Sequence, residues 1–303
     1  MPAVSVILPT YNRANFLAAS ISSVLSQTFT DIELIIADDG SDDEVYAYLC
    51  SIEHPAVRVI RLPHSGNPAR VRNAALRLAT GHYVAFQDSD DVWKPRKLEL
   101  QIEGLAGRRM ARWGYSACDR IDADGAAISD TPAPRAVVRE GWIFPELLRL
   151  EVAAAMPTLI VERQLLVALE GFDECLPFGE FHDLCLRLAL ESPAAAVSEP
   201  LCSVRVHRQH YHADRVAALA SWMRLYEKFA QLAPDPGLRA FSARMRAVCS
   251  TRLAAQHVKR GESRRAWGAL RRSLPFSWRY AGWWWDSLKV CARTVPRVLG
   301  RSA

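Results

Sequence analysis

Two groups of aspartates hold the residues best suited to chemistry in this sequence. Asp38 and Asp39 stand in the segment ADDGSDD, and Asp88, Asp90 and Asp91 stand in the segment FQDSDD. Like charges that gather in one place repel each other unless a cation joins them. Hard divalent cations such as Mn²⁺ and Mg²⁺ take oxygen ligands, usually one or two carboxylates together with substrate phosphates. The two groups therefore indicate a site for a divalent cation and a diphosphate.

The same aspartates also have an ordinary structural explanation. Asp often caps the N-terminus of a helix or closes a turn. For one group alone this explanation is about as good as the metal site. Two groups that each follow a β-like run favour the metal site, because a shared sheet edge would bring them together.

Short β-branched runs alternate with amphipathic segments over the first 90 residues, and the two aspartate groups follow two of these runs. Such alternation predicts a mostly parallel sheet with helices on both faces, an α/β fold. Ligands of such sheets bind at the carboxyl ends of the strands, where the aspartates stand. The predicted strands are Val4–Leu8, Glu33–Ala37, Val57–Leu62 and Tyr83–Phe86, and the predicted helices are Phe16–Gln27, Asp43–Ser51 and Pro68–Ala79.

The pattern beyond residue 90 is less regular and ends in helices. It predicts two domains, an α/β domain over residues 1–212 and a helical, basic, Trp-rich region over residues 213–303. Within the first domain the expected elements are helices at Lys97–Ala106, Phe144–Leu150 and Asp183–Leu190, strands and turns over 112–140, and strands at Thr158–Val161 and Ala194–Val206.

Composition bounds the class of protein. Of 303 residues, 50% are hydrophobic and 23% charged, which is typical of a globular protein with a real core. The seven cysteines form no C-x-x-C pair, which argues against a disulfide framework or a zinc module and favours a reducing compartment. The start of the chain lacks the features of a secretory signal, and no run of about 18 apolar residues occurs. We therefore expect a cytoplasmic protein.

Ordered motifs along the chain are similar to those of family 2 glycosyltransferases of the GT-A fold, over roughly residues 3–210. In order, they are SVILPTYNR, VLSQT, ELIIADDGSDD, ARVRN, GHYVAFQDSDDVW, and GFDE before a motif ending in DLCLRLAL. The resemblance implies that residues 1–212 are a nucleotide-sugar-binding catalytic domain of the GT-A fold. It implies an inverting, hexosyl-type transferase that uses Mn²⁺ or Mg²⁺. Its donor would be a UDP-, GDP- or dTDP-sugar, and its acceptor a saccharide or lipid-linked hydroxyl in polysaccharide or glycolipid biosynthesis.

The resemblance also implies roles for residues that would bind the nucleotide. Pro9, Thr10 and Tyr11 would form the loop around it, and Asp39 would contact the base. Arg72 would contact the nucleotide or its phosphates, although a surface arginine on a helix is the plain alternative.

Metal binding is implied for a second set of residues. Asp88 would face the ribose, and Asp90 would bind the metal, with Asp91 in a supporting or capping position. His207, in SVRVHRQH, matches a position where family members often have a histidine near the metal or diphosphate. A polar surface histidine is the plain alternative.

The general base is the point where the sequence departs from the family. An inverting transfer needs a carboxylate that removes the proton of the acceptor hydroxyl. The family has Glu-Asp followed by two residues and Leu, but residues 180–184 read EFHDL, which puts Phe181 at the base position. Glu180 could act as the base, or Asp183 could, if a helix puts both on one face. A third possibility is a weak or inactive protein that only binds the nucleotide sugar.

The last 65 residues carry a strong positive charge. Residues 239–303 hold 15 Lys and Arg but only Glu262 and Asp286 as acids, interleaved with tryptophans. Trp favours the membrane–water interface and basic side chains favour anionic lipids, so we expect peripheral contact with the inner membrane face. Packing of these helices on the catalytic domain is a close alternative, and nucleic-acid binding is a minor one.

Overall fold

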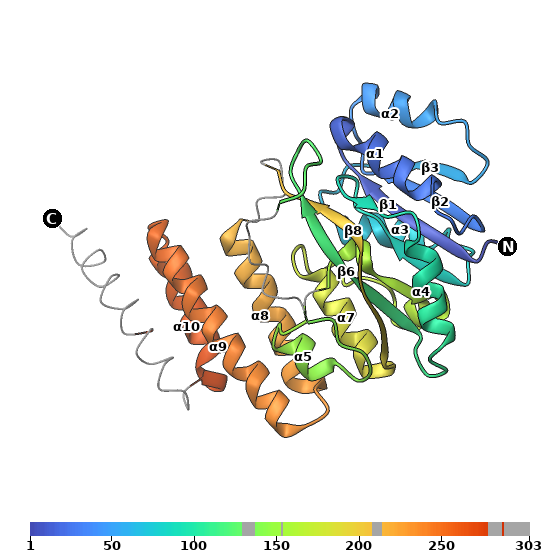
Figure 1. The fold of residues 1–303 in the computed structure, drawn as a ribbon. Coiled ribbons are helices and arrows are strands. Elements are labelled where there is room, and N and C mark those ends of the chain that lie inside the picture. The colour runs from blue at the N-terminus through green and yellow to red at the C-terminus, as the bar shows by residue number, and fades with distance from the viewer. Residues whose placement is uncertain (129–136, 153, 208–213, 278–286, 288–303) are drawn as a thin grey trace. The chain divides into compact units, whose positions relative to one another are not determined.

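The computed structural model describes residues 1–128, 137–152, 154–207, 214–277 and 287. The described residues of Met1–Glu174 and Phe181–His210 form one compact unit, and those of Cys175–Glu180 and Tyr211–Ala303 form a second (Figure 1). The domain boundary expected after residue 212 falls outside the described residues and stays a prediction. The tryptophans beyond residue 277 also lie outside the described residues.

The first unit is built on one sheet, drawn from blue to yellow in Figure 1. In the described ranges it has eight strands in the order β3-β2-β1-β4-β7-β6-β8-β5. The strands are β1 Val4–Thr10, β2 Ile32–Asp38, β3 Val57–Arg61, β4 Tyr83–Phe86, β5 Val92–Trp93, β6 Trp113–Ile121, β7 Ile160–Glu162 and β8 Ala194–Arg205.

Most of the strands run in one direction. β3, β2, β1 and β4 are parallel neighbours, and β8 is parallel to β6. β7 is antiparallel to both β4 and β6, and β5 is antiparallel to β8. The mostly parallel α/β sheet is thus confirmed, with two reversed strands. The two-residue β5 was not predicted, because so short a run carries no periodicity.

Helices cover both faces of the sheet. The helices of this unit are α1 Ala14–Leu25, α2 Asp43–Cys50, α3 Pro68–Leu76, α4 Lys97–Ala106, α5 Phe144–Leu148, α6 Arg163–Ala168 and α7 Glu180–Glu191. Only Glu180, the first residue of α7, groups with the second unit. Buried residues of α1, α2 and α4 share one core with Val4, Val6 and Leu8 of β1. α3 packs on β1 and β2, where the alternate residue Ile7 is fully buried on the other face.

The second unit consists of packed helices in its described part. α8 Arg215–Leu232 packs on α9 Pro236–Lys259, which packs on α10 Ser263–Ser277. Asp235 caps α9 by accepting a hydrogen bond of 3.0 Å from the amide of Leu238. No helix of the described ranges combines the length and the apolar character that a membrane crossing needs.

Candidate functional site

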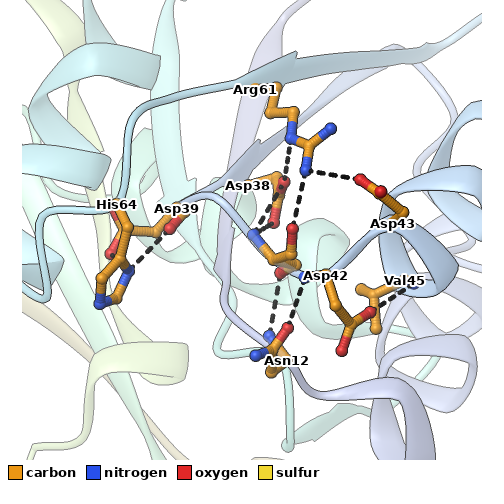
Figure 2. Close-up of polar contacts among 9 residues, drawn as sticks. Asn12, Asp38, Asp39, Asp42, Asp43, Val45, Arg61 and His64 are labelled. Carbon is orange, nitrogen blue, oxygen red and sulfur yellow. Dashed lines mark hydrogen bonds and ion pairs between the residues drawn. The ribbon is translucent and has the colours of Figure 1, made fainter.

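The carboxyl end of β2 carries a buried carboxylate with a structural role. Asp38 is fully buried, and its side chain accepts a hydrogen bond of 3.1 Å from the amide of Ser41. The guanidinium of Arg61, at the end of β3, lies 3.7 Å from Asp38 and also donates to the Ser41 carbonyl (Figure 2). These contacts close the turn after β2, which is the ordinary explanation for an Asp at this place.

Asp39 holds the loop that follows β3. One carboxylate oxygen accepts hydrogen bonds from the Ser65 amide at 2.9 Å and from the Ser65 hydroxyl at 2.8 Å. The other accepts from the Gly66 amide at 2.9 Å and lies 3.1 Å from Nδ1 of His64. Both oxygens are therefore engaged within the protein. The predicted contact of Asp39 with the base stays a prediction, and the structure assigns the carboxylate a loop-holding function.

The rings of Tyr11 and His64 form a partly exposed pair beside the loop that Asp39 holds. Their ring centroids lie 4.1 Å apart with an angle of 23° between the planes, so the rings are stacked. The next residue, Asn12, has a φ of +48°, and its amide donates to the Ser41 hydroxyl. Its side-chain oxygen accepts from the amide of Asp42 (Figure 2). The turn after β1 is thereby fixed to the turn after β2.

The other predicted nucleotide residues lie at the end of β1. Pro9 pairs with Ala37, and Thr10 pairs with Asp38 across the sheet. The Thr10 carbonyl accepts a hydrogen bond of 2.9 Å from the amide of Asp39. Pro9, Thr10 and Tyr11 thus reach the same sheet edge as Asp39, and their contact with a nucleotide stays a prediction.

The turn after β4 reaches the same edge and begins with an ion pair. Arg72, buried on α3, donates a hydrogen bond of 2.7 Å to Oδ1 of Asp88. Its guanidinium lies 5.6 Å from the centroid of the Phe172 ring. The carbonyl of Asp88 accepts from the hydroxyl of Ser20 on α1. Arg72 is therefore not an ordinary surface arginine of a helix, because its side chain is buried and its guanidinium contacts the acidic turn after β4.

Asp90 and His207 meet although 117 residues separate them along the chain. Nε2 of His207 lies 3.0 Å from Oδ2 of Asp90, and the side chains are only 3% and 12% exposed. The imidazole also lies 4.6 Å, between centroids, from the ring of Phe16. The structure brings together the two residues that the resemblance assigned to the metal.

Arg205, at the end of β8, was missed by the sequence analysis. It is buried, and its guanidinium donates to the carbonyls of Asp90, Asp122 and Ala123 at 2.8 to 3.0 Å. It also lies over the ring of Phe16, 5.0 Å from the centroid. The available signal was its position two residues before the histidine, a spacing that puts two side chains on one side of an extended chain.

Asp91, the third acid of this turn, connects the turn to the end of β8. Asp91 is buried and accepts a hydrogen bond of 2.8 Å from the amide of Arg205. Burial, together with the nearby charges of Asp88 and Asp90, raises the pKa of Asp91 to about 9. This raised pKa keeps Asp91 protonated at neutral pH.

The two candidates for the base lie in different surroundings on α7. Glu180 is the first residue of the helix and is half-buried. Asp183 has no exposed surface, and its Oδ2 accepts a hydrogen bond of 2.7 Å from Nε of Arg187. Arg187 also donates to the carbonyls of Leu169 and Gly171. Asp183 is thus part of a buried ion pair that fastens α7, which favours Glu180 as the group that meets an acceptor.

The donor atoms of the Asp90–His207 pair suit a divalent cation. In the described ranges no group of three or more His, Cys, Asp or Glu side chains is arranged to hold an ion. The pair itself supplies one oxygen and one nitrogen within 3.0 Å of each other. A cation that keeps most of its coordination for substrate phosphates needs only one or two protein ligands. The residues present therefore fit a metal that is bound jointly with a diphosphate.

Comparison with known proteins gives the family of the chain. Residues 5–111 match the family model described as glycosyl transferase family 2. The chain carries a family 2 glycosyltransferase domain. The Escherichia coli UDP-Glc:alpha-D-GlcNAc-diphosphoundecaprenol beta-1,3-glucosyltransferase WfgD is 40% identical over 99 residues, 33% of this chain and 39% of that protein.

Solved structures share the fold of this chain at low sequence identity. S. aureus TarS 1–349 in complex with UDP-GlcNAc superposes with a TM-score of 0.67 and 18% identity over 90% of this chain and 81% of that one. The mannosyltransferase PcManGT from Pyrobaculum calidifontis, in complex with GDP-Man and Mn²⁺, has a TM-score of 0.59 and 19% identity over 99% and 88%. The GT-A fold is therefore confirmed.

The chain spans only about a third of the length of the curated relatives that it matches. It spans 29% and 33% of the length of two of them, both named uncharacterized glycosyltransferases from Rickettsia species.

Proposed function

We propose that the chain transfers a sugar from a nucleoside-diphosphate donor to a hydroxyl group of a saccharide or lipid-linked acceptor, with inversion at the anomeric carbon. The observation that carries this proposal is the pairing of Asp90 with His207 at 3.0 Å, on the sheet edge where Arg72 meets Asp88 at 2.7 Å. This edge combines a metal-binding pair with a buried cation, and both suit a diphosphate.

Binding of the donor is assigned to the turns after β1, β2 and β4. Tyr11 offers a ring face to the base, and Asp39 fixes the loop that borders it. Asp88 faces the ribose, while Arg72 supplies positive charge beside the phosphates. The relatives named above include proteins solved with UDP-GlcNAc and with GDP-Man, which supports a nucleotide-sugar donor here.

Asp90 and His207 are the residues that would hold Mn²⁺ or Mg²⁺. A bound divalent cation neutralises the charge that develops on a diphosphate leaving group, a contribution of several kcal/mol in such sites. The protein's own part is to keep the carboxylate and the imidazole together, which Arg205 supports by holding the Asp90 carbonyl. The Mn²⁺ complex of PcManGT supports the use of a divalent metal.

Glu180 is proposed as the base. It would take the proton of the acceptor hydroxyl as that oxygen attacks the anomeric carbon and the diphosphate leaves from the opposite side. Such a group contributes typically ~10²–10⁴-fold to the rate. Asp183 is the weaker candidate, because its carboxylate is buried against Arg187.

A lipid-linked acceptor would place the enzyme at the inner face of a membrane. On α10 the exposed residues Arg264, Trp267 and Arg271 recur at helical spacing, opposite the buried Ala266 and Leu270. A basic face with an aromatic ring suits an anionic lipid surface. Flotation with anionic vesicles tests this: the double variant Arg264→Glu, Arg271→Glu should float less than the wild type, and equal flotation would remove the idea.

The decisive experiment is turnover of nucleotide sugars by the whole chain with Mn²⁺. Thermal shift first identifies the donor, because a bound donor raises the melting temperature by mass action. Release of nucleoside diphosphate is then measured with candidate acceptors, and the product's anomeric configuration is read by NMR. Donor binding without turnover on any acceptor would favour a nucleotide-sugar-binding protein, a possibility that Phe181 at the usual base position keeps open.

A further inference from the structure

We propose that Gln87 and Ser20 act together as positioning residues for the turn 88–91, which carries the proposed metal ligand Asp90. Both side chains are fully buried, so they act through the backbone of the turn and not on the substrate. The inference rests on the proposed function, because it concerns how firmly that site holds a divalent cation. It adds two residues outside the site to those on which metal binding depends.

The hydrogen-bond partners fix the orientation of the Gln87 amide. Nε2 lies 2.7 Å from the carbonyl oxygen of Asp91, which can only accept, so the amide nitrogen faces that oxygen. The second N–H of the same nitrogen donates to Oγ of Ser20 at 3.0 Å. The hydroxyl of Ser20 in turn donates to the carbonyl oxygen of Asp88 at 2.9 Å. A continuous chain of hydrogen bonds therefore links Asp91, Gln87, Ser20 and Asp88.

This chain of hydrogen bonds holds both ends of the acidic turn. The amide of Asp91 also donates to the carbonyl of Asp88 at 3.2 Å, which closes the turn through its own backbone. Gln87 is fixed in its turn, because its amide donates to the carbonyl of Ile7 on β1 at 2.9 Å. The first and the last carbonyl of the turn are therefore tied to α1 and to the end of β4.

Asp90 lies between the two carbonyls that are held. Its Oδ2 atom lies 3.0 Å from Nε2 of His207, and this separation depends on the backbone that the hydrogen bonds orient. Ligands serve a cation only if they are held within about 0.5 Å of the required geometry. Removal of a residue that orients a metal ligand typically lowers metal affinity by about 10–100-fold. We therefore expect Gln87 and Ser20 to affect metal binding without a contact to the metal.

Stability alone does not account for an amide at this position. In the described part of the chain, Oε1 of Gln87 has no hydrogen-bond donor, although the side chain has no exposed surface. A buried oxygen without a donor destabilises a fold, whereas a methionine of similar volume would not have one. What glutamine adds are the two hydrogen bonds that Nε2 donates, one to the acidic turn and one to Ser20.

Nucleotide binding by the full chain, with and without Mn²⁺, tests this. Titration calorimetry gives the affinities for UDP and GDP in Mn²⁺ and in EDTA, and the ratio of the two affinities measures the contribution of the metal. Gln87→Met should reduce this ratio by about 10–100-fold, and Ser20→Ala should reduce it as well. The two effects should not add in the double variant, because the residues form one chain of hydrogen bonds.

Gln27→Met is the matched control. The amide of Gln27 is also buried and also donates to two oxygens, the carbonyls of Ser23 and Lys94, neither of which belongs to the acidic turn. Its melting temperature should fall, as that of Gln87→Met should, because both variants lose buried hydrogen bonds. Its Mn²⁺ ratio should stay that of the wild type.

The positioning role is wrong, while nucleotide binding stands, if Gln87→Met and Ser20→Ala keep the wild-type ratio or if Gln27→Met reduces the ratio equally. Additive effects in the double variant would show that the two residues do not act together. If Gln87→Met does not fold, Ser20→Ala decides alone, since it removes a single hydroxyl. If the wild type binds neither UDP nor GDP in Mn²⁺, the proposed function fails and the inference with it.

Discussion

Nε2 of His207 lies 3.0 Å from Oδ2 of Asp90, although 117 residues separate the two along the chain. Asp90 stands in the turn after β4, and His207 follows the end of β8. The contact connects the end of β4, one of the four neighbouring parallel strands, to the end of β8. It also creates the mixed oxygen and nitrogen pair on which the metal proposal rests.

Loss of His207 should therefore weaken metal use. We expect His207→Ala to raise the Mn²⁺ concentration for half-maximal activity by about 10–100-fold, as for other residues that support a metal site. Activity measured against Mn²⁺ concentration, at saturating donor, gives the result. His54→Ala serves as the control, and an unchanged Mn²⁺ requirement in His207→Ala would contradict the assignment.

The two acids of α7 should separate into a catalytic and a structural group. Glu180→Gln should lower kcat by about 10²–10⁴-fold with little change in melting temperature. Asp183→Asn should instead lower the free energy of unfolding by about 3–5 kcal/mol, because it leaves Arg187 without its buried partner. Steady-state kinetics and denaturant unfolding of both variants distinguish the roles. A stable Asp183→Asn enzyme without turnover would reverse the assignment.

Arg205 should act as a positioning residue of the acidic turn. Its planar guanidinium donates to three carbonyls at once, which the single ammonium of a lysine cannot reproduce. Arg205→Lys should therefore lower kcat and raise the Mn²⁺ requirement, while Arg252→Lys on α9 should change neither. If Arg205→Lys leaves the Mn²⁺ titration unchanged and only lowers the melting temperature, the residue is purely structural.

Much of the sheet was predictable from periodicity. The runs at Val4–Leu8, Tyr83–Phe86 and Ala194–Val206 became strands within two residues of the predicted ends. Buried parallel strands leave an apolar signature that single-sequence analysis detects well. The direction of β7 was not predictable, since a three-residue strand has the same composition whichever way it runs.

The site was predictable as a list of residues but not as a set of contacts. The motifs pointed to Asp39, Arg72 and Asp90, yet the engagement of both Asp39 oxygens by Ser65 and Gly66 depends on the fold. The same holds for Arg205, which carries no motif and acts through carbonyls that belong to distant turns. Tertiary hydrogen bonds of this kind leave no local pattern in a sequence.

Lys97 should make the stability of the protein depend on pH in an identifiable window. Its side chain is fully buried on α4, with Nζ 3.9 Å from the centroid of the Trp93 ring and 2.7 Å from Oε1 of Gln101. Burial lowers the pKa of Lys97 from its ordinary 10.5 to about 7. Between these two values the unfolded chain binds a proton that the folded protein lacks, so stability rises as the pH rises.

We therefore compare wild type with Lys97→Met, which fills a similar volume without a charge. From pH 7 to pH 9 the free energy of unfolding of the wild type should rise relative to that of the variant, by at most about 1.4 kcal/mol per pH unit. Urea unfolding at each pH measures the difference, in which the titration of other groups cancels. Parallel pH curves for the two proteins would mean that Lys97 keeps its proton in the fold, held by the Trp93 ring and the Gln101 amide oxygen.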